Sequence, residues 1–351
     1  MNNDENRWPA AKAQLSGTAC RIAGRHPPLY RLAATLALSL AVFPLAISSG
    51  TALAQAYPTT VIRMISGVQP GSMPDVVGRM IAEKLALALG RQVIFEPRPG
   101  AAGLTGGQVV ARSTPDGHWI GVYTSSDTLA PLLNPGTVDP KDLAPVATVA
   151  TVPTGLTVTT AKNYKTLADL VADAKAHPGK LVAASAGFVT ATHLSLERFR
   201  IAAKLNILHV PSKGAAGAIA ELLADRADMY FSPVPGALAL IKSGKLRVLA
   251  MSSAKRSALF PEVPTTLELG YPDSDYNFWI GISAPVKTPR TIVQRLNKET
   301  SAAVTSPEMR DKFLNIGAEP LAMGVAEFEA MVRDALESNA VLIKTKGFRP
   351  E

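Results

Sequence analysis

Three loops rich in glycine, serine and threonine have residue types and spacing that suit ligand chemistry. They span residues 70–75, 99–103 and 185–192. Each follows a predicted strand and opens a predicted helix, where the first backbone N–H groups have no partner within the helix. The positive end of the helix dipole adds to these donors. The three loops therefore predict a site for a carboxylate or another small anion.

Ordinary helix capping is the competing interpretation of these loops. Ser72, Asp75 and Thr192 are residue types that accept hydrogen bonds from the first turn of a helix. Taken singly, each loop favours capping over binding. Three such loops in one α/β chain favour a small anionic ligand.

The sequence lacks the motifs of phosphate-binding and metal-binding sites. The run from Gly100 to Gly106 is neither a dinucleotide fingerprint nor a P-loop. The five histidines give no H-E-x-x-H pattern and no carboxylate cluster, so we expect no metal and no cofactor.

A serine hydrolase is the alternative function. Ser185 stands in the run Ala-Ala-Ser-Ala-Gly, which resembles a nucleophile elbow with alanine in place of the first glycine. A triad would need His193 or His209, the only histidines that follow. Helix capping or core packing is the more common role for His193. We therefore expect no catalytic residue and no enzyme activity.

Alternating strands and helices must position these loops. Strand patterns at 61–65, 93–95 and 119–123 alternate with helical patterns at 75–89 and 104–112. A second unit repeats the alternation, with strands expected at 156–159, 181–184, 207–210, 229–231 and 246–251. Its helices are expected at 167–176, 192–203 and 215–223. A strand at 280–284 and helices at 291–305, 307–314 and 325–344 follow. This order predicts two α/β lobes with mostly parallel sheets.

Composition limits the protein class. The chain has 351 residues, enough for about two domains. Its 47% hydrophobic content is that of a globular protein, and one cysteine excludes a disulfide scaffold. The net charge of +8 comes from scattered Lys and Arg, so we expect no nucleic-acid partner.

The first 54 residues have the pattern of a secretory signal. A basic segment precedes an uncharged run at 32–47, and Ala52-Leu53-Ala54 follows as a cleavage site. The run is short for a membrane span. We expect a cleaved signal peptide at 1–54 and a periplasmic protein.

Short motifs along the mature sequence resemble the Bug family of extracytoplasmic solute receptors, which serve tripartite tricarboxylate transporters. The motifs are Pro70-Gly71-Ser72 with Asp75, Arg98-Pro99-Gly100-Ala101, Pro115-Asp116-Gly117-His118, His193-Leu194 with Glu197, Val210-Pro211 with Lys213-Gly214, Gly244-Lys245-Leu246-Arg247, and Trp279 with Gly281 and Ala284-Pro285. Each motif is weak alone, but their order and spacing are specific.

The resemblance implies a two-lobed periplasmic-binding-protein fold, type II-like, with helices flanking each sheet. Two crossover strands, near 155–160 and 280–285, would join lobe 1 (55–155 plus 284–351) to lobe 2 (156–283). A small carboxylate-containing ligand would lie between the lobes. The residues implied for ligand binding are Pro70, Gly71, Ser72, Asp75, Thr124, Ser125, Ser126, Gly187, Thr190, Thr192, His193 and Ser212.

The resemblance also implies partners. These are membrane subunits of the transporter or a sensor protein, with the receptor itself a monomer. The chain departs from the family pattern at Val68, Ser72, Met73 and Ser212, which leaves the ligand less defined than the fold.

Export gives the first testable prediction. Cleavage after Ala54 should leave Gln55 as the mature N-terminus, within about two residues. N-terminal mass analysis of the protein purified from the cell envelope measures this directly. Recovery of a chain that still carries residues 1–54 would contradict it.

Overall fold

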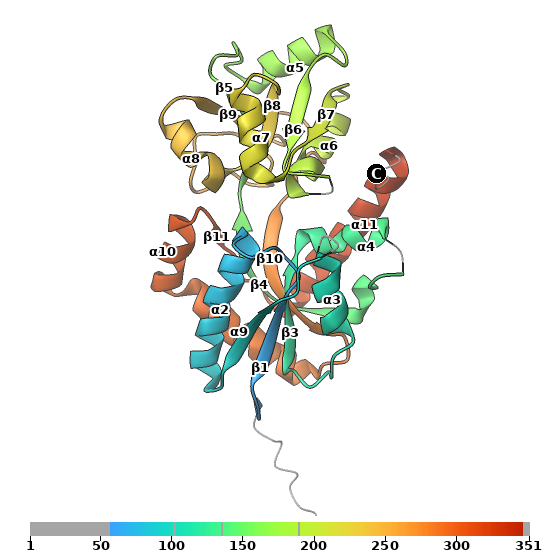
Figure 1. Cartoon of the computed structure of the whole chain (residues 1–351), viewed down its shortest axis with the longest axis vertical. Coiled ribbons are helices and arrows are strands. Elements are labelled where there is room, and N and C mark those ends of the chain that lie inside the picture. The colour runs from blue at the N-terminus through green and yellow to red at the C-terminus, as the bar shows by residue number, and fades with distance from the viewer. Residues whose placement is uncertain (1–56, 101–102, 135, 189, 347–351) are drawn as a thin grey trace, which may run out of the picture. The chain divides into compact units, whose positions relative to one another are not determined.

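Two β-sheets organise the protein (Figure 1). The computed structural model describes residues 57–346 except 101–102, 135 and 189. The expected signal segment, 1–54, lies outside the described residues. Among the helices that the structure describes, none is both long enough and apolar enough to span a membrane.

The first lobe contains a six-stranded sheet in the order β11-β4-β10-β3-β1-β2. Its strands are β1 (Ile62–Ser66), β2 (Val93–Pro97), β3 (Trp119–Thr124), β4 (Leu143–Val152), β10 (Phe278–Pro285) and β11 (Glu319–Pro320). Its helices are α2 (Met73–Leu89), α3 (Leu104–Ala111), α4 (Ala130–Leu133), α9 (Arg290–Thr305), α10 (Pro307–Asn315) and α11 (Val325–Lys346). Short 3-10 turns cover Ser125–Thr128 and Pro140–Asp142.

The second lobe contains a five-stranded sheet in the order β7-β6-β8-β5-β9. Its strands are β5 (Thr154–Thr159), β6 (Val182–Ser185), β7 (Leu208–Pro211), β8 (Met229–Pro233) and β9 (Leu246–Met251). Its helices are α5 (Leu167–Ala176), α6 (Ala191–Ala203), α7 (Gly214–Leu223) and α8 (Val234–Lys242).

Both sheets are mixed: most strands run in one direction, as expected, and strands β10 and β5 run opposite to their neighbours. Strand β1 pairs in parallel with β2 and β3, but β10 pairs antiparallel with β3 and β4. In the second sheet β6 is parallel to β7 and β8, while β5 is antiparallel to β8 and β9. The reason is topological: the chain leaves the first sheet through β4 and returns through β10 in the opposite direction. The prediction of two α/β lobes is confirmed.

Apolar side chains cover both faces of each sheet. In β1, Met64 packs with α2 and α9, whereas the next residue, Ile65, packs on the opposite face with α3 and α11. In β8, Phe231 and Tyr230 likewise belong to separate clusters on opposite faces. Sheets covered on both faces need continuous apolar strands rather than alternating ones.

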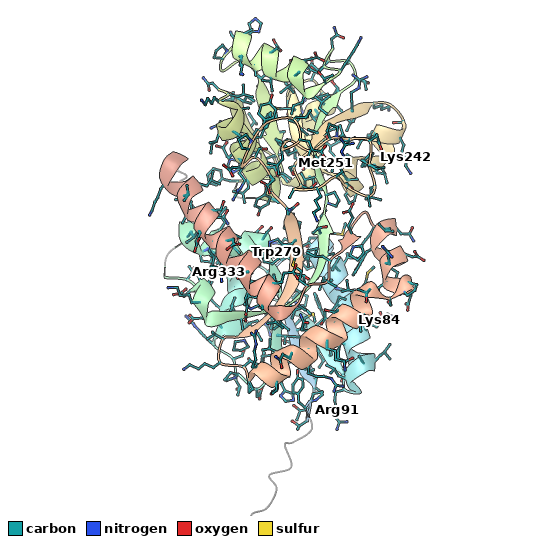
Figure 2. All side chains as sticks on the ribbon, turned by 180° about the vertical axis from the view of Figure 1, so that it is seen from behind. Lys84, Arg91, Lys242, Met251, Trp279 and Arg333 are labelled. Atoms are coloured by element: carbon teal, nitrogen blue, oxygen red, sulfur yellow. The ribbon has the colours of Figure 1, made fainter. Side chains whose placement is uncertain are left out.

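The two crossings between the sheets are held together by buried hydrogen bonds. Strand β5 begins at Thr154, two residues after the end of β4. The Ser252 hydroxyl, fully buried after β9, lies 3.1 Å from the Thr154 carbonyl oxygen and 3.2 Å from that of Tyr276. Figure 2 labels Met251 and Trp279, which flank the return crossing.

The chain passes between the two sheets at slightly different positions from those expected. Strand β10 lies whole in the first sheet, so the chain returns before Phe278 rather than at 283–284. The division into lobes at 55–155 plus 284–351 and 156–283 otherwise stays a prediction.

A close contact on β10 gives the second prediction. A methyl carbon added at Gly281 would lie 2.7 Å from the Ala147 carbonyl oxygen and 2.8 Å from the Phe328 ring. Gly281→Ala should therefore lower the free energy of unfolding by about 1–3 kcal/mol. Gly324→Ala is the control, because nothing lies within 4 Å of its added carbon. Urea unfolding measures both variants, and equal stability losses would contradict the packing argument.

Candidate functional site

The expected site residues lie at the carboxyl ends of parallel strands. In the first lobe they follow β1 and β3, and in the second lobe they follow β6 and β7. Ligands of open α/β sheets bind at this edge, where the loops leave backbone donors exposed. The structure thus groups the predicted residues by strand end.

The loop after β1 is held by a buried carboxylate. Asp75, which is 3% exposed, accepts a hydrogen bond from the Gly71 N–H at 3.0 Å and pairs with Arg79. Burial alone would raise the pKa of Asp75, but the bonds from Arg79 and Gly71 outweigh it and hold the pKa below its usual value. Asp75 is thereby ionised and positions Gly71, beside the exposed Pro70.

Ser72 is placed at the start of α2 but does not cap it. It occupies the N-cap position, yet its hydroxyl donates to the Gln69 carbonyl oxygen at 2.6 Å and no side chain caps the helix. The competing interpretation, in which Ser72 caps α2 through its side chain, is therefore wrong. Its hydroxyl stabilises the preceding turn instead.

The segment after β3 contains a carboxylate that the sequence analysis missed. Asp127 accepts hydrogen bonds from the Thr124 N–H at 2.7 Å and the Thr124 hydroxyl at 2.8 Å. Burial raises the pKa of Asp127 to about 6, against the lowering effect of these two bonds. The Thr-x-x-Asp spacing of a capping box was the available sequence signal. Buried Ser125 accepts from the Tyr276 hydroxyl at 3.0 Å, and Ser126 is partly exposed.

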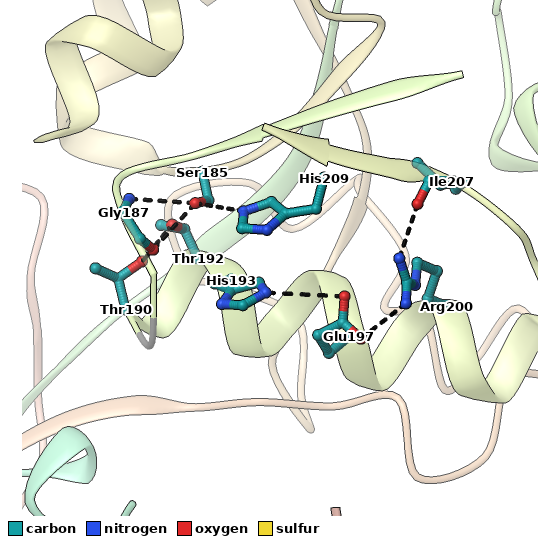
Figure 3. Close-up of polar contacts among 9 residues, drawn as sticks. All are labelled: Ser185, Gly187, Thr190, Thr192, His193, Glu197, Arg200, Ile207 and His209. Atoms are coloured by element: carbon teal, nitrogen blue, oxygen red, sulfur yellow. Dashed lines mark hydrogen bonds and ion pairs between the residues drawn. The ribbon is translucent and has the colours of Figure 1, made fainter. Parts of the chain in front are cut away.

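The loop after β6 is closed by hydroxyl groups (Figure 3). The Ala186 N–H donates to the Thr192 hydroxyl oxygen at 2.9 Å. Thr190 donates to the Gly187 carbonyl oxygen at 2.8 Å, and the Thr190 and Thr192 hydroxyl oxygens are 2.9 Å apart. Gly187 has φ of 138°, which only glycine adopts readily.

The structure also contradicts the competing interpretation of Thr192 as a helix cap. Thr190, not Thr192, occupies the N-cap of α6, and no side chain caps that helix. Thr192 is 3% exposed and fixes the loop through Ala186. The first turn of α6 therefore keeps its dipole end uncapped by side chains, next to the partly exposed Thr190 hydroxyl.

Two stacked imidazoles lie beside this loop (Figure 3). His193 and His209 have ring centroids 3.9 Å apart and an interplanar angle of 11°. Burial lowers the pKa of His193 to about 3, with further lowering by His209 and Arg200. Burial and Arg200 lower the pKa of His209 to about 4. Both rings are therefore neutral at pH 7.

The Ser185–His209 contact resembles a nucleophile and its base. Ser185 Oγ lies 2.8 Å from His209 Nε2, which the sequence could not show because 24 residues separate them. However, Ser185 is 0% exposed, and the Gly187 N–H and carbonyl lie 3.2 and 3.0 Å from Oγ. A buried hydroxyl with its lone pairs and proton already engaged is suited to fixing the loop rather than to attacking a substrate.

Ser212 lies at the end of β7, beside the same loop. Its N–H donates to the Ser185 carbonyl oxygen at 2.9 Å, and the Gly214 N–H donates to Ala186 at 3.0 Å. The Ser212 side chain is partly exposed. Its backbone thus joins the ends of β6 and β7.

One apolar cluster connects the strand ends of the two lobes. Leu129 of the first lobe packs in the same cluster as Leu194 of α6 and Tyr276 of the return crossing, with Phe188 packed against it. Within the first lobe, Gly103 approaches both Gly67 after β1 and Asp127 after β3. These contacts bring the segments after β1 and β3 together and place Leu129 in one cluster with Phe188 of the loop after β6.

The chain is similar in sequence to a known protein family and to known relatives. The family profile described as the tripartite tricarboxylate transporter family receptor matches residues 77–348. Protein BugT of Bordetella pertussis is 32% identical over 298 residues, covering 84% of this chain and 91% of BugT.

Solved structures agree with this similarity. The periplasmic binding protein BugD is 30% identical with a TM-score of 0.69, covering 84% of this chain and 100% of BugD. An R. palustris protein solved with adipate is 28% identical with a TM-score of 0.71, covering 84% of this chain and 100% of that one.

The neutral imidazole stack gives the third prediction. The unfolded chain binds protons at both histidines near pH 6.5, whereas the folded protein binds them only near pH 4 and below. The contribution of the two neutral histidines to the free energy of unfolding should be fully present above pH 6.5. It should fall as the pH decreases towards 4, because the unfolded state binds more protons there.

His209→Gln removes one of these titrations. Its loss of unfolding free energy between pH 7 and pH 4.5 should be smaller than that of the wild type by at least about 1 kcal/mol. Urea unfolding at the two pH values gives the comparison. Parallel losses in both proteins would show that His209 does not titrate as described.

Proposed function

Because this chain belongs to the family of tripartite tricarboxylate transporter receptors, we propose that it binds a small carboxylate-containing ligand between its two lobes. The membership confirms the resemblance noted in the sequence. One solved relative, BugD, is a periplasmic binding protein, and another was solved with adipate. In this proposal the protein acts as a receptor and has no catalytic role.

The uncapped start of α6 carries this proposal. The N-cap residue Thr190 makes no side-chain cap hydrogen bond to this helix of 13 residues, and its hydroxyl and the Gly187 loop lie beside the first turn. Backbone N–H groups and the helix dipole favour a negative group at that position. A ligand carboxylate would complete the hydrogen bonding that capping side chains supply elsewhere.

The proposed contacts come from both lobes. Thr190 and the backbone near Gly187 would hold the carboxylate from the second lobe, with Thr192, His193 and Ser212 supporting that loop. Gly71, Ser72 and the Thr124–Ser126 segment would approach from the first lobe. Hydroxyls that now donate to neighbouring carbonyl oxygens, as Thr190 does, can donate to a ligand instead.

Location and partners belong to the same proposal. The protein would act in the periplasm as a monomer and deliver its ligand to membrane subunits of a tripartite tricarboxylate transporter, or signal its presence to a sensor. Export through residues 1–54 would place it there. Periplasmic relatives such as BugD support this location.

A ligand screen tests the proposal. We expect at least one of a set of small carboxylates, including adipate and malate, to raise the melting temperature. Binding to the folded state adds about 2.7 kcal/mol of stability at a ligand concentration of 100 times Kd. If no carboxylate in the set stabilises the purified mature protein, the proposed function is wrong.

Thr190→Val then tests the site, as the fourth prediction. A hydrogen bond to a charged group contributes roughly 1.5–3 kcal/mol, so the variant should bind the identified carboxylate about tenfold more weakly or worse. Thr160→Val is the control, because its exposed hydroxyl also donates to a backbone carbonyl, that of Gly244. Calorimetric titration compares the two, and equal affinities would remove Thr190 from the site.

A further inference from the structure

One carboxylate at the first-lobe strand ends has no positive partner. Asp127 uses Oδ2 for both bonds from Thr124. Among the described residues no donor bonds Oδ1, and no Lys, Arg or His forms an ion pair with the side chain. Asp75, in the first turn of α2, differs because Arg79 neutralises it.

The groups facing Asp127 do not supply the missing charge. The titratable groups placed against it are the phenols of Tyr123 on β3 and Tyr276 on the return crossing. Burial raises the pKa of both phenols, that of Tyr276 to about 12, so they are neutral. Asn339 of α11, which donates to Thr128 in the same turn, is also neutral.

A glycine, Gly103, lies against Asp127 Oδ1. A methyl carbon at Gly103 would lie 2.9 Å from Asp127 Oδ1, and one at Gly67 would lie 2.3 Å from the Gly103 carbonyl oxygen. Gly103 also has φ of 100°, where side chains are strained. The Gly103 backbone therefore lies against one side of Oδ1, while Asp127 stays partly exposed at the proposed ligand site.

The capping box explains the bonds to Asp127 Oδ2 but not the position of Oδ1. Thr166 and Asp169 form the same motif at the start of α5, where Asp169 accepts from the Thr166 N–H at 2.8 Å. There the carboxylate is exposed to water. At Asp127 the same motif holds a negative charge in a partly buried position, where an unpaired charge is costly.

We propose that the ligand carries a positive group as well as a carboxylate, and that Asp127 Oδ1 binds this positive group. The ligand class is then an amino-carboxylate or a related zwitterion rather than a simple dicarboxylate. The inference rests on the proposed function, because it assigns the second half of the same ligand. A dicarboxylate would instead place its own negative charge beside Asp127.

Matched ligand pairs test the inference. Calorimetric titrations at pH 7.5 compare 6-aminohexanoate with adipate, and 4-aminobutanoate with succinate; each pair has the same chain length and differs by ammonium against carboxylate. The wild type should bind at least one amino-carboxylate tenfold or more tightly than its dicarboxylate. Asp127→Asn should remove that preference, because it retains an acceptor for Thr124 but no charge.

Asp169→Asn is the control variant. It makes the same change in the other capping box and should leave both affinities as in the wild type. Repeating the wild-type titrations at pH 5 adds an independent measurement. Protonation of Asp127 near pH 6 should weaken amino-carboxylate binding, because the ammonium group of the ligand keeps its charge at both pH values.

The outcomes separate the two claims. Dicarboxylates that bind the wild type as tightly as the amino-carboxylates would overturn the inference and leave the proposed function standing. An Asp127→Asn variant that retains the preference would also overturn it. If neither series binds and the wider carboxylate screen also finds nothing, the proposed function fails, and the inference fails with it.

Discussion

The antiparallel pairing of β4 with β10 is the constraint on which the two-lobed structure depends. Strand β4 leads the chain towards the second sheet and β10 brings it back, so a single ladder fixes both connections. Strand β10 also pairs with β3, which aligns Thr124 with Ile280. The end of β3, with its hydroxyl groups, is thereby set beside the crossings. Gly281 permits this closeness because it leaves space for the Ala147 carbonyl and the Phe328 ring.

Uncharged hydrogen bonds shape the second-lobe half of the candidate site. Ser185, Thr192 and Ala186 tie the loop after β6 to the neighbouring strand and helix, and His209 supports Ser185 from β7. Burial holds both stacked imidazoles neutral, so the loop carries dipoles rather than a fixed positive charge. Dipoles at a helix start attract a carboxylate without the desolvation cost of a buried cation.

The two carboxylates of the first lobe, Asp75 and Asp127, differ in whether a positive group inside the protein balances their charge. Asp75 is buried and bonded to Arg79 and the Gly71 N–H, so its charge is satisfied within the protein. Asp127 receives two bonds on one oxygen and no cation on the other. A charge satisfied internally stabilises a loop, whereas an unsatisfied one at a ligand edge selects what can bind there. The same residue type thus has two roles, set by its neighbours.

The sequence by itself determined the local elements and the loops that join them. Helix Leu167–Ala176 and strand Leu246–Met251 have the expected bounds, because their apolar spacing and their ends are local signals. Only the tertiary structure decided the rest. Strand β4 was not predicted, since its run of Ala, Val, Thr and Pro is stabilised by β10, more than 120 residues away in sequence. The Ser185–His209 contact and the charge state of Asp127 depend in the same way on partners that a local pattern does not record.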